Sequence, residues 1–158
     1  MKQKHLIPAL TGAATLACVL TACDNGCEQK REALLHAEFT SSSGRTLRAM
    51  EVIAISGEAG YQMGVNKFDD VEFDLNPNDS LTCFMITSTY TDFGDSFVMT
   101  DTVEVAYQVQ PYYLDMACGC TVRYQLASVR STRNFFNDVR VLEPLVLTES
   151  GINMVFEY

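Results

Sequence analysis

Cysteines are the residues of this chain whose surroundings most clearly indicate chemistry, beginning with Cys23. It ends the sequence Leu20-Thr21-Ala22-Cys23, which follows a basic start and a short apolar stretch. Small residues before such a cysteine are typical of a secretory signal of the lipoprotein type. We therefore expect residues 1–22 to be removed and Cys23 to carry a diacylglyceryl thioether, with acyl chains such as palmitate.

The alternatives for this segment are a membrane span and an ordinary secretory signal that happens to hold cysteines. A span needs about 20 apolar residues, and this run is shorter. A second candidate junction at Cys18 has Thr15 where Leu20 stands in the better match. Two acyl chains anchor a protein stably. The sequence therefore predicts a lipid anchor in the cell envelope, with the outer membrane as the expected location.

The four remaining cysteines of the mature chain are Cys27, Cys83, Cys118 and Cys120, and they allow three pairings. A bridge within Cys118-Gly119-Cys120 would close a small strained ring, and strain makes a disulfide more oxidising. This pattern supports a thiol–disulfide exchange factor as one alternative function. The structural alternative is that each cysteine pairs elsewhere. A bridge from Cys27 to this segment would close about 90 residues and stabilise the fold by about 4 kcal/mol.

Acidic residues cluster in the sequence and suggest a cation site. In the second alternative function, a weak calcium-binding module, Asp69, Asp70 and Asp74 would supply the oxygen ligands. Residues 74–79 imitate the start of a calcium loop but lack its glycine at position six. The favoured interpretation is a turn beside a solvated strand edge, with no metal bound.

Catalytic groups are sparse in the mature chain. His36 is its only histidine, and neither a nucleophile elbow nor a phosphate-binding glycine loop is present. We expect no enzyme activity and no cofactor.

Tyrosines and two short patterns favour surface recognition. Tyr107, Tyr112, Tyr113 and Tyr124 would line a glycan or peptide groove, or else pack in the core as cross-strand pairs. Asp79-Ser80-Leu81 and Asp101-Thr102-Val103 resemble an acceptor pattern for O-glycans, which makes Ser80 and Thr102 candidate attachment sites beside expected turns.

The elements that must position these residues are short strands. Apolar and polar residues alternate at 50–56, 71–75, 103–109 and 122–128, and residues 81–90 are β-branched and aromatic. Pro111 is expected to end one run, and residues 92–95 to break another. Residues 28–37 fit a helix or a strand. Even spacing predicts an all-β fold, an antiparallel β-sandwich of Greek-key type.

Length and charge limit the organisation and the partners. Residues 23–32 form a lipidated tether and residues 33–158 a single domain. The chain has a formal charge of −9, and Lys2 and Lys4 lie in the signal, so the mature part carries −11. Such acidity repels phosphate backbones, and we expect no nucleic-acid partner.

The order of several segments resembles a family of small uncharacterised lipoproteins of Bacteroidetes. These segments are 23–27, 75–78, 117–120 and the closing 143–156. The resemblance implies no catalytic residue or ligand. It implies that Cys27 and Cys118 form the principal disulfide, that a Cys83–Cys120 bridge is disfavoured, and that the segment after Arg31 is a strand. The sequence thus predicts a structural or interaction lipoprotein, held to the membrane through Cys23, with a protein or glycan partner.

Overall fold

Every regular element in the described part of the chain is a β-strand. The computed structural model describes residues 32–55, 62–65 and 67–158, and the predicted all-β class is confirmed over these ranges. No helix in them is long and apolar enough to cross a membrane. The strands are β1 (Leu35–Thr40), β2 (Thr46–Ala54), β3 (Gln62–Val65), β4 (Val71–Phe73), β5 (Leu81–Asp92), β6 (Asp95–Asp115), β7 (Gly119–Ser131), β8 (Asp138–Val141), β9 (Leu145–Val146) and β10 (Met154–Glu157).

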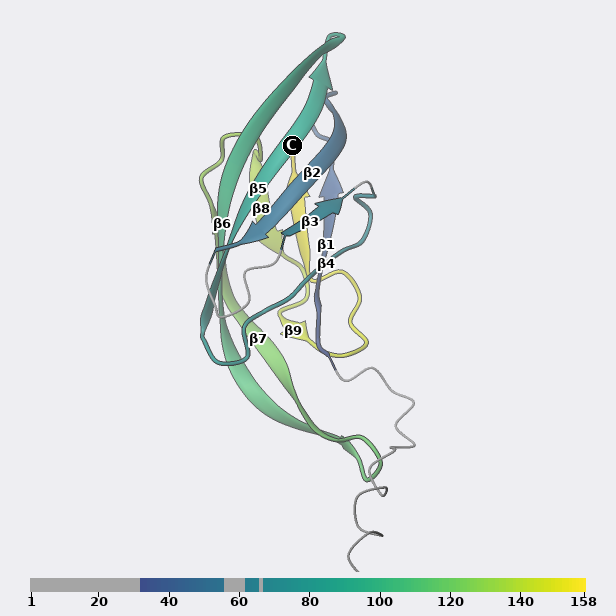
Figure 1. The fold of residues 1–158 in the computed structure, drawn as a ribbon, viewed down its shortest axis with the longest axis vertical. Helices are drawn as coiled ribbons and strands as arrows, with labels where there is room; N and C mark the ends of the chain where they lie inside the picture. The colour runs from purple at the N-terminus through teal and green to yellow at the C-terminus, as the bar shows by residue number, and fades with distance from the viewer. Residues whose placement is uncertain (1–31, 56–61, 66) are drawn as a thin grey trace, which may run out of the picture.

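The strands form two sheets (Figure 1). The larger has the order β3-β2-β5-β6-β7-β9 and the smaller the order β4-β1-β10-β8. All pairs in the larger sheet are antiparallel. In the smaller sheet β1 and β10 run parallel, with Ala37 opposite Met154. The antiparallel prediction is wrong for this pair because the rest of the chain forms the long crossover that parallel strands require.

Residues from both sheets share one hydrophobic core. The predicted alternation holds in β2, where Met50, Val52 and Ala54 are buried. Phe73 of the smaller sheet packs edge-on against Phe84 of the larger, with ring centroids 5.1 Å apart. Aromatic pairs in this geometry stabilise a core by about 1 kcal/mol beyond the area they bury.

The first strand resolves the choice between helix and strand at residues 28–37, as far as that segment is described. Leu35, Ala37 and Phe39 are buried, and their neighbours are half-buried. This period of two is that of a strand. The favoured strand assignment is confirmed from Leu35 onward, and residues 28–31 lie outside the described part.

Pro111 does not end its strand, contrary to the prediction. β6 continues to Asp115, and Pro111 lies opposite Val122 of β7. The pairing of β6 with β5 ends at Ala106. Beyond that point one side of β6 is a sheet edge, where a proline without an N–H is tolerated.

A β-bulge in β7 alters its inward face. Ala106 lies opposite Ser128 and Tyr107 opposite Leu126, so Ala127 is the extra residue. Tyr124 and Leu126 are buried as predicted, but Ser128 is exposed. An extra residue shifts the alternation by one, and Val129 then takes the inward position.

Two hairpins project at opposite ends of the molecule (Figure 1). In the β5–β6 turn, Phe93 and Gly94 have φ angles of 49° and 97°, as in the two-residue turns that suit hairpins. In the β6–β7 turn, the Asp115 carboxylate accepts the N–H groups of Ala117 at 2.8 Å and Cys118 at 2.6 Å. Both ends of the long strand β6 are therefore closed by ordered turns.

Candidate functional site

The Cys-Gly-Cys segment separates its two cysteines. Cys118 is 3% exposed and disulfide-bonded, whereas Cys120 is an exposed free thiol. Gly119 between them has a φ of +72°. The proposed Cys118–Cys120 bridge is therefore not formed, and the thiol-exchange alternative loses the strained ring on which it rested.

Cys83 and Cys120 lie too far apart to be bridged. Cys83 is opposite Glu104 of β6, and Cys120 is opposite Tyr113 of the same strand. Those two positions are nine residues apart, about 30 Å at 3.3 Å per strand residue. A disulfide needs α-carbons within about 7 Å. The Cys83–Cys120 pairing, already disfavoured, is therefore wrong. Cys23 and Cys27 lie outside the described residues, so lipidation and the Cys27–Cys118 pairing stay predictions.

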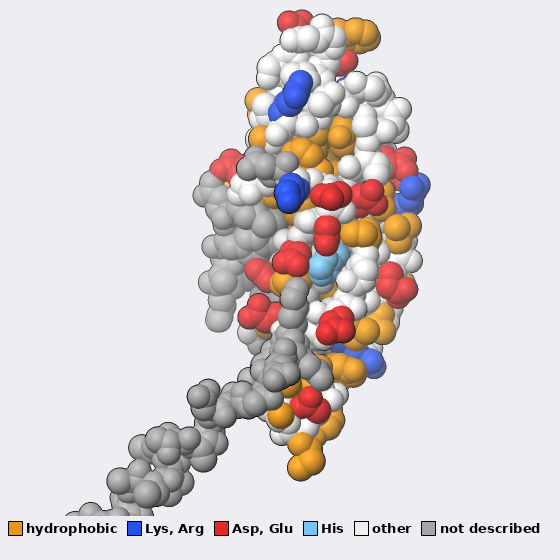
Figure 2. Space-filling model, turned by 90° about the vertical axis from the view of Figure 1, so that its right-hand side faces the viewer, with side chains coloured by type: hydrophobic (Ala, Val, Ile, Leu, Met, Phe, Trp, Pro, Cys, Tyr) orange, Lys and Arg blue, Asp and Glu red, His pale blue; other side chains and the backbone are white. Residues whose placement is uncertain are grey.

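His36 is held among carboxylates on one acidic face (Figure 2). Its Nδ1 lies 2.7 Å from Asp70 and its Nε2 lies 4.0 Å from Glu72. The imidazole is 12% exposed, while the two acids are about half exposed. Burial raises the pKa of nearby Asp74, and the charges of Glu32 and Glu72 raise it further. The histidine therefore links β1 to β4 within a region of excess negative charge.

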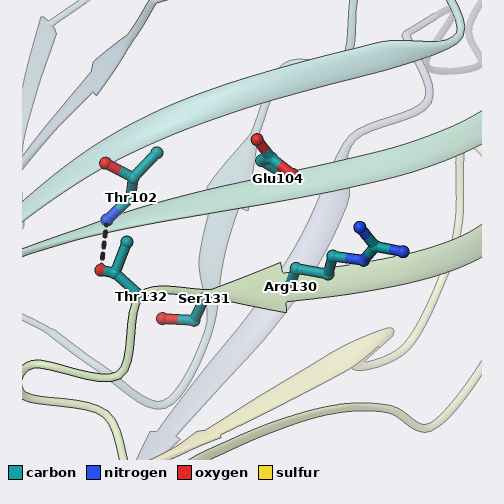
Figure 3. Close-up of a pocket in the computed structure, with 5 residues that line it drawn as sticks. All are labelled: Thr102, Glu104, Arg130, Ser131 and Thr132. Carbon is teal, nitrogen blue, oxygen red and sulfur yellow. Dashed lines mark hydrogen bonds between the residues drawn. The ribbon is translucent and has the colours of Figure 1, made fainter.

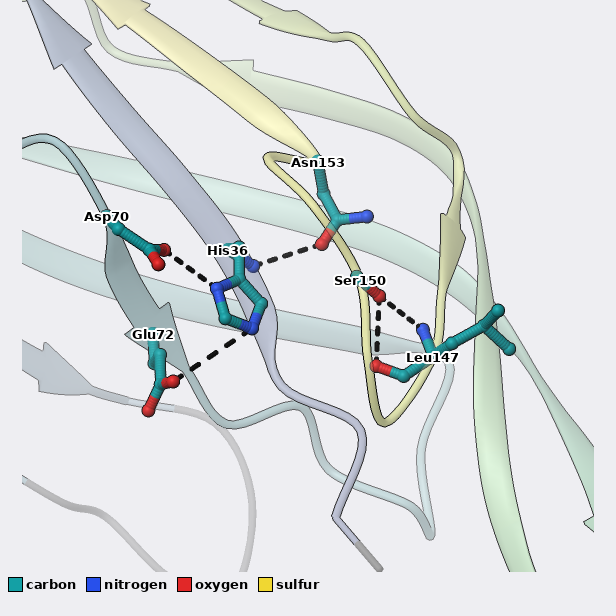
Figure 4. A network of polar contacts seen from close by, with 6 residues as sticks. All are labelled: His36, Asp70, Glu72, Leu147, Ser150 and Asn153. Carbon is teal, nitrogen blue, oxygen red and sulfur yellow. Dashed lines mark hydrogen bonds and ion pairs between the residues drawn. The ribbon is translucent and has the colours of Figure 1, made fainter. Parts of the chain in front are cut away.

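The backbone beside His36 is fixed by buried Asn153 (Figure 4). The Asn153 side chain accepts the His36 N–H at 3.0 Å, and the His36 carbonyl accepts the Asn153 N–H at 2.8 Å. Its amide also donates to the carbonyls of Glu143 and Leu145. Nearby, the Ser150 hydroxyl closes the turn at Leu147 through two hydrogen bonds. The buried amide of Asn153 therefore holds the backbone of β1 to the segment that contains Glu143 and Leu145.

The acidic residues proposed as calcium donors do not converge. Over residues 32–55, 62–65 and 67–158 no group of three His, Cys, Asp or Glu side chains is placed to hold a metal ion. In the loop 74–79, Asn76 accepts the N–H of Asn78 at 3.0 Å and Asp79 that of Ser80 at 2.7 Å. These side chains bind their own backbone, as a turn requires.

The tyrosines do not form a common groove. Tyr107 and Tyr124 are 2% and 4% exposed and pack edge-on with centroids 5.3 Å apart. The Tyr107 hydroxyl lies 2.7 Å from Thr82 Oγ1 and donates to the carbonyl of Asn76 at 2.9 Å. Tyr113 is 56% exposed, and the guanidinium of Arg123 lies over the Tyr112 ring. The core interpretation is correct for the first two tyrosines.

The two candidate glycan acceptors differ in position. Ser80 is exposed in the turn before β5. Thr102 lies inside β6, not beside a turn, and lines a depression of about 170 Å³ with Glu104, Arg130, Ser131 and Thr132 (Figure 3). Ligand pockets usually exceed about 300 Å³. Because Ser80 is exposed in a turn and Thr102 is half-buried within a strand, the structure favours Ser80 over Thr102 as an attachment site.

Asp101, which sequence reasoning treated only as part of the glycan pattern, is a fully buried acid. Its carboxylate accepts the Thr132 hydroxyl at 2.7 Å and the N–H groups of Asn134, Phe135 and Phe136 at 2.6, 2.8 and 3.2 Å. A buried carboxylate needs such donors. The available signal was its spacing of two from Val103, which places it on the inward face.

Exposed apolar side chains at the hairpins were also missed. Phe93 is 105% exposed at the β5–β6 turn, and Phe97, Val98 and Met99 follow at 44%, 63% and 37%. Met116 is 96% exposed at the β6–β7 turn. A φ of 49° is uncommon for a non-glycine residue. Residues 92–95 were predicted only to break a strand, and no role was predicted for the aromatic residue within them.

Comparison with known proteins defines the class of protein but not its activity. Residues 49–156 match the model of a family of unknown function, DUF6452. The chain belongs to this family, and the match covers β3 to β9 in full and all but the last residue of β10. No curated protein matches the chain, and no solved structure matches it.

Proposed function

We propose that this protein is a lipoprotein of the cell envelope, anchored through Cys23, with a non-catalytic interaction role at the end of the fold that carries the β5–β6 hairpin. The observation that carries the proposal is Phe93, which is fully exposed in a strained conformation at the turn. An exposed aromatic residue in a left-handed conformation stabilises nothing in the isolated domain, and such features concentrate at functional sites.

A protein partner is favoured over a glycan. Two of the four tyrosines that could have stacked on a sugar, Tyr107 and Tyr124, are buried in the core. The apolar residues of the β5–β6 hairpin instead offer contacts of the kind found at the centre of protein interfaces. We infer further that the two sheets form the predicted β-sandwich, supported by the packing of Phe73 on Phe84.

The anchor is tested by the intact mass of the mature protein and by fractionation of the variant Cys23→Ser. A diacylated mass, with loss of membrane association in the variant, is expected. Unmodified Cys23 in membrane-bound protein would contradict the anchor.

The interaction role is tested with a photo-crosslinking residue at Phe93. A residue of the same kind at Leu142, which is 54% exposed, is the matched control. We expect one adduct of defined mass at position 93 and none at 142. Equal adducts at both positions, or none at 93, would contradict a specific partner at this hairpin.

A further inference from the structure

The β6–β7 hairpin combines apolar exposure with the absence of net charge. Met116 is 96% exposed and Tyr113 56% exposed. Residues 109–125 contain one acid, Asp115, and one base, Arg123, so their formal charge is zero in a chain of charge −9. The Asp115 carboxylate is turned onto the backbone of Ala117 and Cys118. The surface of this turn is therefore mostly apolar, with tyrosines and an arginine behind it.

The β5–β6 hairpin at the opposite end also exposes apolar side chains, but it carries negative charge. Residues 87–100 contain Asp92 and Asp95 and no Lys or Arg. Asp92 lies 3.7 Å from Arg45, the residue just before strand β2, which leaves Asp95 as excess negative charge. Anionic lipid headgroups repel such a surface and tolerate a neutral one. Tyr and Arg, in turn, are residue types that suit the membrane interface.

The described chain begins on the side of the β6–β7 hairpin (Figure 1). Glu32 lies close enough to Asp74 to raise its pKa, and the next residue, Leu75, accepts the Tyr124 hydroxyl at 3.1 Å. Tyr124 lies opposite Val109 on β6. From Val109 to Met116 the hairpin extends by seven residues, about 23 Å.

The tether length matches this extension. Nine residue steps lead from Cys23 to Glu32, and they reach at most about 30 Å. The tether therefore reaches from Glu32 about as far as the hairpin extends. A lipid on Cys23 keeps the bilayer within about that distance of the folded domain. If Cys27 is the disulfide partner of Cys118, only four residue steps remain between lipid and hairpin, about 14 Å.

We propose that the tip of the β6–β7 hairpin, with Met116 and Tyr113, inserts into the interface of the phospholipid bilayer that carries the lipid anchor. This inference rests on the proposed anchor at Cys23. It gives the molecule one orientation, in which β6 runs toward the membrane and Phe93 lies beside the start of this strand, at the end of the molecule farthest from the bilayer.

The chain contains no tryptophan, so one introduced tryptophan reports on one position. The variants Met116→Trp and Phe93→Trp, both at fully exposed sites, are purified as lipidated full-length protein and bound to phosphatidylethanolamine–phosphatidylglycerol vesicles. We expect emission from position 116 to shift to the blue and to be largely lost with lipids brominated near the headgroup. Emission from position 93 should change in neither respect.

The outcomes separate the two proposals. If the protein floats with the vesicles and position 116 is unquenched, the hairpin contact is wrong and the anchor stands. Quenching at position 93 in place of 116 overturns the orientation. If the mature protein carries no lipid and does not float, the anchor is wrong and the inference falls with it.

Discussion

The carboxylate of Asp101 accepts the backbone N–H of Phe135 at 2.8 Å, although 34 residues separate them in the sequence. The same carboxylate also binds the N–H of Phe136. Both phenylalanine side chains are buried, at 1% exposure each, and Phe135 stacks on Tyr158 with centroids 5.1 Å apart. One buried acid of the larger sheet thus positions two aromatic residues of the core.

We expect Asp101→Ala to lower the free energy of unfolding by about 3 kcal/mol, because buried N–H groups lose a charged acceptor. Urea unfolding at neutral pH measures the change. Asp95→Ala, at the exposed start of the same strand, is the matched control and should change stability by less than about 0.5 kcal/mol. Equal effects of the two substitutions would show that the network does not stabilise the fold.

Stability should fall steeply in alkaline solution because of Tyr124. Burial, followed by the effects of Tyr107 and Asp74, raises the pKa of Tyr124 from 10.0 to about 12. The unfolded chain then loses this proton at lower pH than the folded chain, so stability declines as the pH rises from 10 to 12. We expect Tyr124→Phe to show a shallower decline in urea midpoint over this range, whereas Tyr113→Phe keeps the original slope. Identical slopes for both variants would contradict the assignment.

Thiol labelling should distinguish the cysteines by their environments. Without reduction, the mature unfolded protein should take up label at Cys83 and Cys120 and none at Cys118, which is disulfide-bonded. In the folded protein Cys120 should react first, since it is exposed and Cys83 is half-buried. Peptide mass spectrometry after labelling gives the positions. Label on Cys118 before reduction would refute the disulfide.

The β5–β6 turn should be stabilised by removing its aromatic residue. Phe93→Asn places a residue that tolerates positive φ at the turn, and we expect a gain of about 0.5–1 kcal/mol in thermal or urea unfolding. Phe93→Ala removes the ring but keeps the strain, so its stability should stay near that of the original chain. Both variants should bind the partner captured at this hairpin more weakly than the original chain does. A destabilised Phe93→Asn would show that the ring has a structural role.

Much of the fold was predictable because strand alternation is a local property. The buried positions Met50, Val52 and Ala54 of β2 and Val103, Val105 and Tyr107 of β6 follow from period-two patterns in which every second residue is apolar. Pro111 misled the prediction because its effect depends on whether a neighbouring strand needs its N–H. The bulge at Ala127 could not be predicted, because only the pairing of β7 with β6 shows which residue is extra.

The candidate sites were less predictable. The chemistry of Cys118 and Cys120 depends on which way a turn at Gly119 directs each side chain, and the pattern of the segment does not show this. Asp101 and Phe93 were overlooked because one draws its donors from a loop more than 30 residues away and the other is defined by having no neighbours.

The sequence by itself determined the all-β class, the inward faces of most strands, the acidity of the chain and the membership of residues 49–156 in their family, since composition and alternation are local. Only the tertiary structure decided that β1 pairs in parallel with β10, that Asp101 is buried beneath four donors, and that two hairpins carry apolar tips at opposite ends of β6. Those features depend on contacts between distant segments. Their free energies arise only when both partners are in place.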